Sequence, residues 1–168
     1  MREGRPLVHA IEMLNDVMVE AGDPQQFCTL AAGMLSRETR DGRSAVTVDL
    51  VLAGHAKPVV VRADGTTEQI GRYGTALGLL ETVDLQCTQH RLAAGETLLL
   101  YTDGVTECRR GPEQFDEHRL LEAAAGASGT SAARLVATVR EAAESFATDA
   151  RGDDIALLAV RAGPSDGS

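Results

Sequence analysis

Two short segments of the sequence place acidic side chains at the ends of aliphatic runs. Asp103 follows the run TLLLY, while Asp153 and Asp154 precede the run IALLAV. If these runs are neighbouring antiparallel strands, one strand ends where the other begins, so the acids lie at the same edge of a sheet. Carboxylate oxygens are the ligands that Mg²⁺ and Mn²⁺ prefer, and a water molecule on such a cation can attack phosphorus or a carbonyl carbon. The pattern is compatible with a divalent-cation site.

A glycine beside each acidic segment fits the same interpretation. Gly104 follows Asp103 and Gly152 precedes Asp153, and a residue without a Cβ lets the backbone approach a ligand closely. An ordinary structural explanation also exists, because Asp-Gly is a common turn and an Asp-Asp pair before a strand is often a solvated loop. The spacing alone leaves both explanations open.

Hydrophobic periodicity predicts the elements that would position these acids. Alternating or continuous apolar runs predict strands, and apolar residues at three- and four-residue spacing predict helices. The last helix begins at Thr130 or Ser131 as its N-cap, and the helix before it ends at Gly126 as a C-terminal cap. The predicted strands lie at 27–35, 45–55, 59–70 (a hairpin turning at Asp64-Gly65), 85–92, 97–104 and 153–162, and the helices at 6–21, 115–126 and 130–148.

This order of elements predicts an α/β fold of mostly antiparallel β-sheets flanked by helices. No repeat or linker divides the chain, so we predict one domain of residues 1–162 followed by a disordered tail at 163–168.

Composition limits the class of protein. The chain has 168 residues, 43% hydrophobic and 24% charged, and a formal net charge of −9, which argues against binding to nucleic acid or to an anionic membrane. Cys28, Cys87 and Cys108 are widely spaced, as in reduced thiols rather than a disulfide framework or a zinc site. The sequence shows no signal-peptide pattern and no membrane-spanning apolar run, so we expect a cytoplasmic protein.

The residue identities in several motifs resemble those of a known protein family. LLLYTDGVTECR together with ARGDDIALLAVR resembles the SpoIIE-like branch of the PPM-type metal-dependent protein serine/threonine phosphatases. LAGHAKPVVVRADGTTEQIG, followed by ALGLLE, is similar to a hairpin of the same family. The resemblance covers residues 27–161, with the motifs in the family's order. It implies a PPM phosphatase-like α-β-β-α sandwich that hydrolyses phosphoserine or phosphothreonine with water activated by Mn²⁺ or Mg²⁺.

The resemblance also assigns residues. Asp103 and Asp153 match metal-coordinating aspartates, Asp154 matches the neighbouring polar position, and Gly104 and Gly152 support the site. It assigns no catalytic group beyond the metal ligands. The substrates that it implies are phosphoproteins such as anti-sigma-factor antagonists, in bacterial stress or sigma-factor signalling.

The family's first two metal-binding motifs have no counterpart in this sequence. They read G-G-D-[WFY]-[YF]-D and D-V-x-G-[HKM]-G, and Gly22-Asp23 is followed by PQQF, which is no substitute. We therefore expect an N-terminally truncated domain that hydrolyses phosphoprotein poorly by itself, with a homodimer or another chain able to complete the site. The alternatives are a catalytically inactive remnant acting as a binding or regulatory module, and an unrelated small α/β binding domain.

Four other residues invite a catalytic role that the sequence does not favour. His55 lies in a turn between two predicted strands, so we expect it to be structural. Thr102 and Glu107 flank the acidic motif and are also expected to be structural. Cys108 stands next to Arg109 and could have a lowered pKa, but nothing supplies the partner base that a cysteine nucleophile needs.

Overall fold

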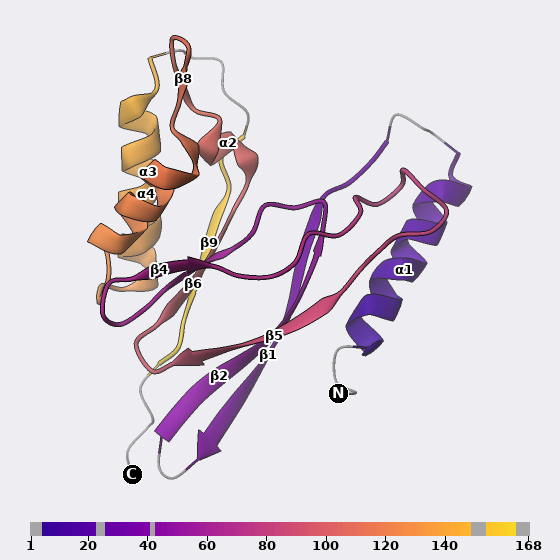
Figure 1. Cartoon of the computed structure of the whole chain (residues 1–168), viewed down its shortest axis with the longest axis horizontal. Helices are drawn as coiled ribbons and strands as arrows, with labels where there is room; N and C mark the ends of the chain where they lie inside the picture. The colour runs from indigo at the N-terminus through magenta and orange to yellow at the C-terminus, as the bar shows by residue number, and fades with distance from the viewer. Residues whose placement is uncertain (1–4, 23–25, 41–42, 149–153, 164–168) are drawn as a thin grey trace. The chain divides into compact units, whose positions relative to one another are not determined.

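A computed structural model describes residues 5–22, 26–40, 43–148 and 154–163 of the chain (Figure 1). The chain divides into two compact units that alternate along the sequence. The first unit takes residues 1–38, 46–57 and 70–91, and the second takes 39–45, 58–69 and 92–168. Among the described helices, none has both the length and the apolar character that crossing a membrane requires.

The first unit packs one helix against a three-stranded sheet. The sheet has the strand order β1-β2-β5. On α1, Ile11 is buried against Val51 and Ala53 of β2 and against Leu77, as its amphipathic spacing predicts. The elements are α1 (Arg5–Glu20), β1 (Leu30–Arg40), β2 (Arg43–Ala53) and β5 (Cys87–Ala93).

A buried polar side chain joins α1 to the loop after β4. Asn15 is only 1% exposed; its side-chain oxygen accepts a hydrogen bond from the Gly78 N–H at 2.9 Å, and its amide nitrogen donates to the Leu80 carbonyl at 3.0 Å. Both polar ends of the side chain are therefore satisfied, which is what makes a buried asparagine tolerable.

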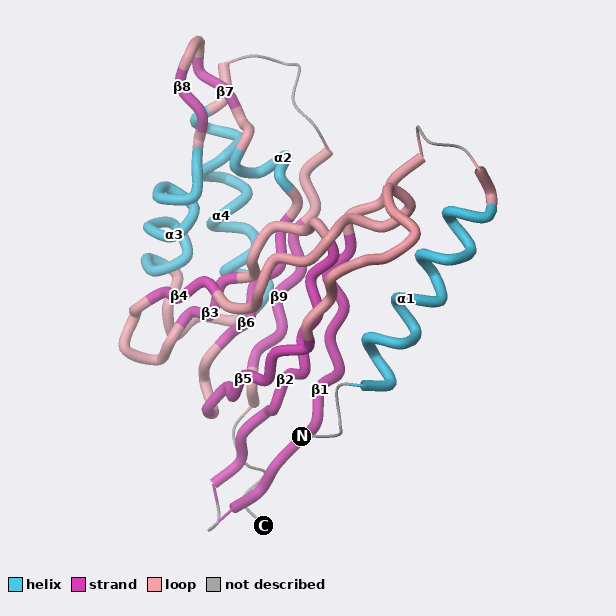
Figure 2. Tube along the Cα trace, turned by 45° about the vertical axis from the view of Figure 1, so that its right-hand side comes forward, coloured by secondary structure: helices cyan, strands magenta, loops and turns pink. Residues whose placement is uncertain are grey.

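The second unit is built on a four-stranded antiparallel sheet with the order β4-β3-β6-β9. Its strands β3 and β6 are mostly buried, and helices α3 and α4 pack beside the sheet (Figure 2). Leu99 of β6 pairs with Val59 of β3 on one side and Ala159 of β9 on the other. The sheet strands are β3 (Val59–Val61), β4 (Thr67–Gln69), β6 (Thr97–Tyr101) and β9 (Leu157–Arg161).

The remaining elements of the second unit follow β6. They are α2 (Asp103–Thr106), β7 (Arg109–Arg110), β8 (Glu113–Gln114), α3 (Asp116–Gly126) and α4 (Ala132–Phe146). Ser131 is the N-cap of α4, and its hydroxyl accepts a hydrogen bond from the Arg134 N–H at 3.2 Å. The buried side of α4 carries Leu135, Val139 and Ala143, four residues apart, because those positions fall on one helical face.

The predicted fold class is confirmed: each unit combines a β-sheet with helices, and the sheet of the second unit is antiparallel. The predicted end of the helix at Gly126 is confirmed, but the predicted cap is wrong, because Gly126 is the last residue of α3 and Ala127 is its C-cap. Most of the predicted tail, from residue 164 onward, lies outside the described residues.

Candidate metal site at the ends of β6 and β9

Asp103 lies where β6 gives way to a short helix. The strand ends at Tyr101, Thr102 keeps an extended backbone (φ −84°, ψ 157°), and Asp103 is the first residue of α2. The Asp103 side chain is exposed, and its Oδ1 accepts a hydrogen bond from the Gly104 N–H at 3.0 Å. Gly104 itself is buried. The carboxylate of Asp103 is therefore exposed to solvent just after the end of the buried strand β6, at the edge of the sheet.

The segment that leads into β9 lies beside the end of β6. β6 and β9 are antiparallel, with Tyr101 opposite Leu157, and the Thr102 N–H extends the ladder by donating to the Ala156 carbonyl at 3.1 Å. The Thr102 hydroxyl then donates to the Asp154 carbonyl at 2.9 Å and accepts from the Ala156 N–H at 2.9 Å. The structure thus brings the backbone of Asp154 to the residue that precedes Asp103. Asp153 and Gly152 lie outside the described residues.

The donor atoms suit a hard divalent cation but form only part of a ligand set. Asp103 and Asp154 are both exposed, and neither forms an ion pair with another side chain in the described part of the chain. Two uncompensated carboxylates at one edge match the oxygen ligands that Mg²⁺ and Mn²⁺ take. Among the described residues, however, no group of three or more His, Cys, Asp or Glu side chains could hold a metal ion. A cation held here would need further ligands.

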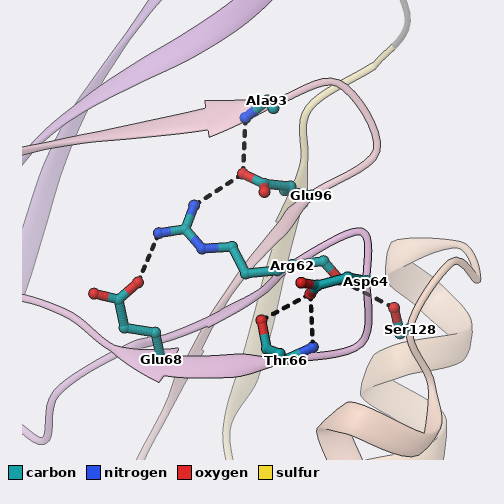
Figure 3. Close-up of polar contacts among 7 residues, drawn as sticks. All are labelled: Arg62, Asp64, Thr66, Glu68, Ala93, Glu96 and Ser128. Atoms are coloured by element: carbon teal, nitrogen blue, oxygen red, sulfur yellow. Dashed lines mark hydrogen bonds and ion pairs between the residues drawn. The ribbon is translucent and has the colours of Figure 1, made fainter.

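Several acidic side chains elsewhere in the described part of the second unit form ion pairs, unlike Asp103 and Asp154. Figure 3 shows Arg62 donating to Glu68 at 2.7 Å and to Glu96 at 2.9 Å. Glu96 also accepts a hydrogen bond from the Ala93 N–H, and the hydrogen bond with Glu68, assisted by Glu96, raises the pKa of Arg62. The Ser128 hydroxyl donates to the Arg62 carbonyl, so this network joins three turns of the unit, and its two carboxylates share the one guanidinium of Arg62.

The structure corrects the expectation for Cys108. Its thiol is buried and donates to the Gly104 carbonyl at 3.2 Å. Burial, with a smaller contribution from the nearby Glu144 carboxylate, raises the pKa of Cys108 instead of lowering it. A thiol with a raised pKa is less ionised at neutral pH, so Cys108 is a packing residue beneath α2.

A small hairpin that the sequence did not predict follows Cys108. β7 and β8 pair antiparallel, with Arg109 opposite Gln114. The guanidinium of Arg110 lies 4.5 Å from the centre of the Phe146 ring, and Arg119 of α3 lies 4.8 Å from the same ring. The Thr148 N–H donates to the Arg109 carbonyl at 3.0 Å. The hairpin therefore packs against the C-terminal end of α4. The sequence did not predict it because strands of two residues are too short to show an alternating pattern.

His55 lies in a tight turn of the first unit. Its Nδ1 is 3.1 Å from the Ala56 carbonyl, a contact in which the ring nitrogen donates. The preceding Gly54 has φ 66°, and a Cβ there would lie 2.6 Å from the Cβ of Ala76, so this turn needs its glycine for space as well as conformation. The surroundings of His55 are those of a turn residue.

The resemblance implies a phosphatase, and for that activity we expect His55→Ala to leave phosphate release almost unchanged. Losing a true general acid or base costs roughly a hundredfold to ten-thousandfold in rate. The measurement is turnover of a phosphopeptide by the variant, beside its melting temperature and its Mn²⁺ affinity. Loss of turnover with stability and metal binding intact would show that His55 is catalytic.

Comparison with known proteins places nearly the whole chain in one family. The family model described as Stage II sporulation protein E (SpoIIE) matches residues 1–163. The Synechocystis protein IcfG is 25% identical over 155 residues, which are 91% of this chain but 24% of IcfG. The chain thus spans about a quarter of the length of this relative.

Solved structures share the fold. The PP2C phosphatase domain with a fragment of the regulatory domain of SpoIIE from Bacillus subtilis matches with a TM-score of 0.68 at 15% identity, covering 94% of this chain and 44% of that one. The catalytic domain of the serine threonine protein phosphatase PstP, solved with two manganese ions, matches with a TM-score of 0.57 at 19% identity, covering 91% and 68%. Since the family model spans nearly all of the sequence, the chain belongs to the SpoIIE family.

Proposed function

We propose that this chain forms part of a protein serine/threonine phosphatase that hydrolyses phosphoserine or phosphothreonine in another protein with the help of Mn²⁺ or Mg²⁺. The observation that carries the proposal is the joining of two acid-bearing strand ends, Asp103 after β6 and Asp154 before β9, through Thr102. Their carboxylates lack ion pairs with the described side chains, unlike Glu68 and Glu96. Membership of the SpoIIE family supports the assignment.

In this proposal the acidic side chains hold the cation and do no other chemistry. Asp103, Asp153 and Asp154 provide oxygen ligands, and Gly104 and Gly152 leave room around them. A bound cation would activate a water molecule for attack on phosphorus. The other ligands would come from residues outside the described part of the chain, from a completing chain or from a second copy in a homodimer. We assign no further catalytic residue.

The substrate class and setting rest on the resemblance. A phosphoprotein such as an anti-sigma-factor antagonist, in bacterial stress or sigma-factor signalling, is the proposed substrate. The proposed location is the cytoplasm, consistent with three widely spaced cysteines. The exposed carboxylates of the site face solvent, as access by a large protein substrate requires.

The proposal predicts slow, strictly metal-dependent phosphate release. The purified chain is titrated with Mn²⁺ and, separately, Mg²⁺ in the presence of phosphoserine and phosphothreonine peptides, with a phosphotyrosine peptide as the control substrate. We expect release from the first two peptides that rises with metal and stops on chelation with EDTA. The rate is expected to be low because the described residues supply only part of a ligand set. Release that EDTA does not affect would contradict the proposal.

A second candidate function is a noncatalytic binding or regulatory module. The absence of any group of three metal-binding side chains among the described residues favours it. The same titration separates the two candidates. Stable binding of a phosphoprotein, with no phosphate released at any metal concentration, would support the binding module and reject the enzyme.

A further inference from the structure

Thr102 stands at a helix N-terminus but does not cap the helix. A threonine at the N-cap ordinarily accepts a hydrogen bond from the backbone two or three residues later. Here the Thr102 backbone has the extended conformation of an N-cap, yet its side chain makes no capping bond to α2. The first turn of α2 instead receives a bond from Gly104 N–H to Asp103 Oδ1. The side chain of Thr102 is suited to capping α2, but its hydrogen bonds are made elsewhere.

The hydroxyl of Thr102 binds a segment more distant in the sequence. It donates to the carbonyl of Asp154 and accepts from the N–H of Ala156, both at 2.9 Å. Because a hydroxyl can donate and accept at once, one side chain satisfies two backbone groups on the segment that leads into β9. With the Thr102 N–H bonded to the Ala156 carbonyl, three hydrogen bonds hold this segment just beyond the last paired residues, Tyr101 and Leu157.

These bonds lie next to both exposed acids. Asp103 follows Thr102 directly, and the Asp154 carbonyl is itself one of the bonded atoms. Strand ends beyond a ladder have few packing contacts and open easily. Without the hydroxyl, the backbone of Asp154 would lose its tie to the end of β6, and the spacing between the two carboxylates would no longer be fixed.

We propose that Thr102 is a positioning residue, whose hydroxyl sets the spacing of the acid-bearing ends of β6 and β9 and thereby the affinity of the site for a divalent cation. This inference rests on the proposed function, because it assumes that the acids bind metal. Thr102 acts through Asp103 and Asp154. The branched Cβ of threonine restricts χ1 and so keeps the hydroxyl aimed at β9.

The test compares Mn²⁺ binding by isothermal titration calorimetry to the full chain and to three variants. Thr102→Val removes the hydroxyl and keeps the shape, so we expect Mn²⁺ affinity to fall about tenfold, in the range that outer-shell partners of metal ligands contribute. Thr102→Ser keeps the hydroxyl and is expected to recover most of the affinity. Thr88→Val is the matched control, since it removes a hydroxyl that donates to the Leu50 carbonyl in the first unit, and it should bind as the unaltered chain does.

Asp103→Asn separates failure of this inference from failure of the proposed function. If Asp103→Asn leaves Mn²⁺ binding unchanged, the proposed function is wrong. If Asp103→Asn abolishes binding while Thr102→Val binds normally, only the positioning role is wrong. A Thr102→Val variant that melts at a lower temperature yet binds Mn²⁺ as before would make Thr102 merely structural and overturn the inference.

A measurement on the unaltered chain covers the case in which Thr102→Val does not fold. The Ala156 N–H is bonded to the Thr102 hydroxyl, so its exchange with solvent deuterium should be slow in the metal-free protein. Exchange at the rate of an unprotected amide would overturn the inference, because the Thr102 hydroxyl would then not hold the segment before β9 in place in the metal-free protein.

Discussion

Replacing Asp103 by asparagine is expected to abolish the metal-dependent release of phosphate. The change removes one negative charge and one strong oxygen ligand while keeping the size of the side chain, and its amide can still accept the bond from Gly104 N–H. Displacing reacting groups by about 1 Å already costs on the order of a hundredfold, so we expect at least that loss. The measurement is the rate of phosphate release from a phosphothreonine peptide at saturating Mn²⁺.

The control for Asp103→Asn is Asp64→Asn. Asp64 is an exposed aspartate in the turn between β3 and β4, where it accepts hydrogen bonds from the backbone and hydroxyl of Thr66. It undergoes the same chemical change in the same unit but takes no part in the proposed site. Equal rates for the two variants would show that Asp103 has no special role, and the proposed metal site would have to be abandoned.

Replacing Leu99 by alanine is expected to have the largest effect on stability. Leu99 is fully buried in β6, between β3 and β9, so the substitution leaves a cavity in the middle of the sheet. Buried leucine-to-alanine changes cost about 2 to 5 kcal/mol of unfolding free energy. The measurement is the midpoint of urea unfolding followed by circular dichroism.

The matched control lies on the neighbouring strand. Leu158 of β9 is 59% exposed, so Leu158→Ala removes the same atoms from a position that water already reaches. We expect it to change the unfolding free energy by no more than about 0.5 kcal/mol. Similar losses for the two variants would mean that Leu99 does not lie in a packed core.

Local patterns in the sequence predicted most of the elements of the second unit. The alternation around Asp64 and Gly65 predicted the β3–β4 hairpin, and the structure has Gly65 at φ 88° with Thr66 N–H bonded to Asp64. The spacing of apolar residues predicted α4, and the predicted choice between Thr130 and Ser131 as its N-cap is resolved in favour of Ser131. These features depend on residues close to each other in the chain, which is why the sequence contains enough information to predict them.

Features that depend on distant partners could not be predicted. The lowered pKa expected for Cys108 rested on the adjacent arginines, but Arg110 pairs with Glu113 and stacks on Phe146, and burial then controls the thiol. The two bonds of the Thr102 hydroxyl need partners that are brought close only by pairing of β6 with β9. For the candidate site, the sequence indicated the acids and the shared edge, but not the residue that joins them.

The position of β9 in the sheet has a consequence for how the protein is made. β9 pairs with β6, yet it emerges from the ribosome only after α2, β7, β8, α3 and α4. Until then the β6 backbone has an open hydrogen-bonding edge beside buried leucines, which is a template for wrong pairing between nascent chains. The acids at 103 and 154 likewise meet only when this last strand docks. A partly synthesised chain therefore cannot bring the two carboxylates together, so the proposed metal site forms only after β9 has been synthesised and has paired with β6.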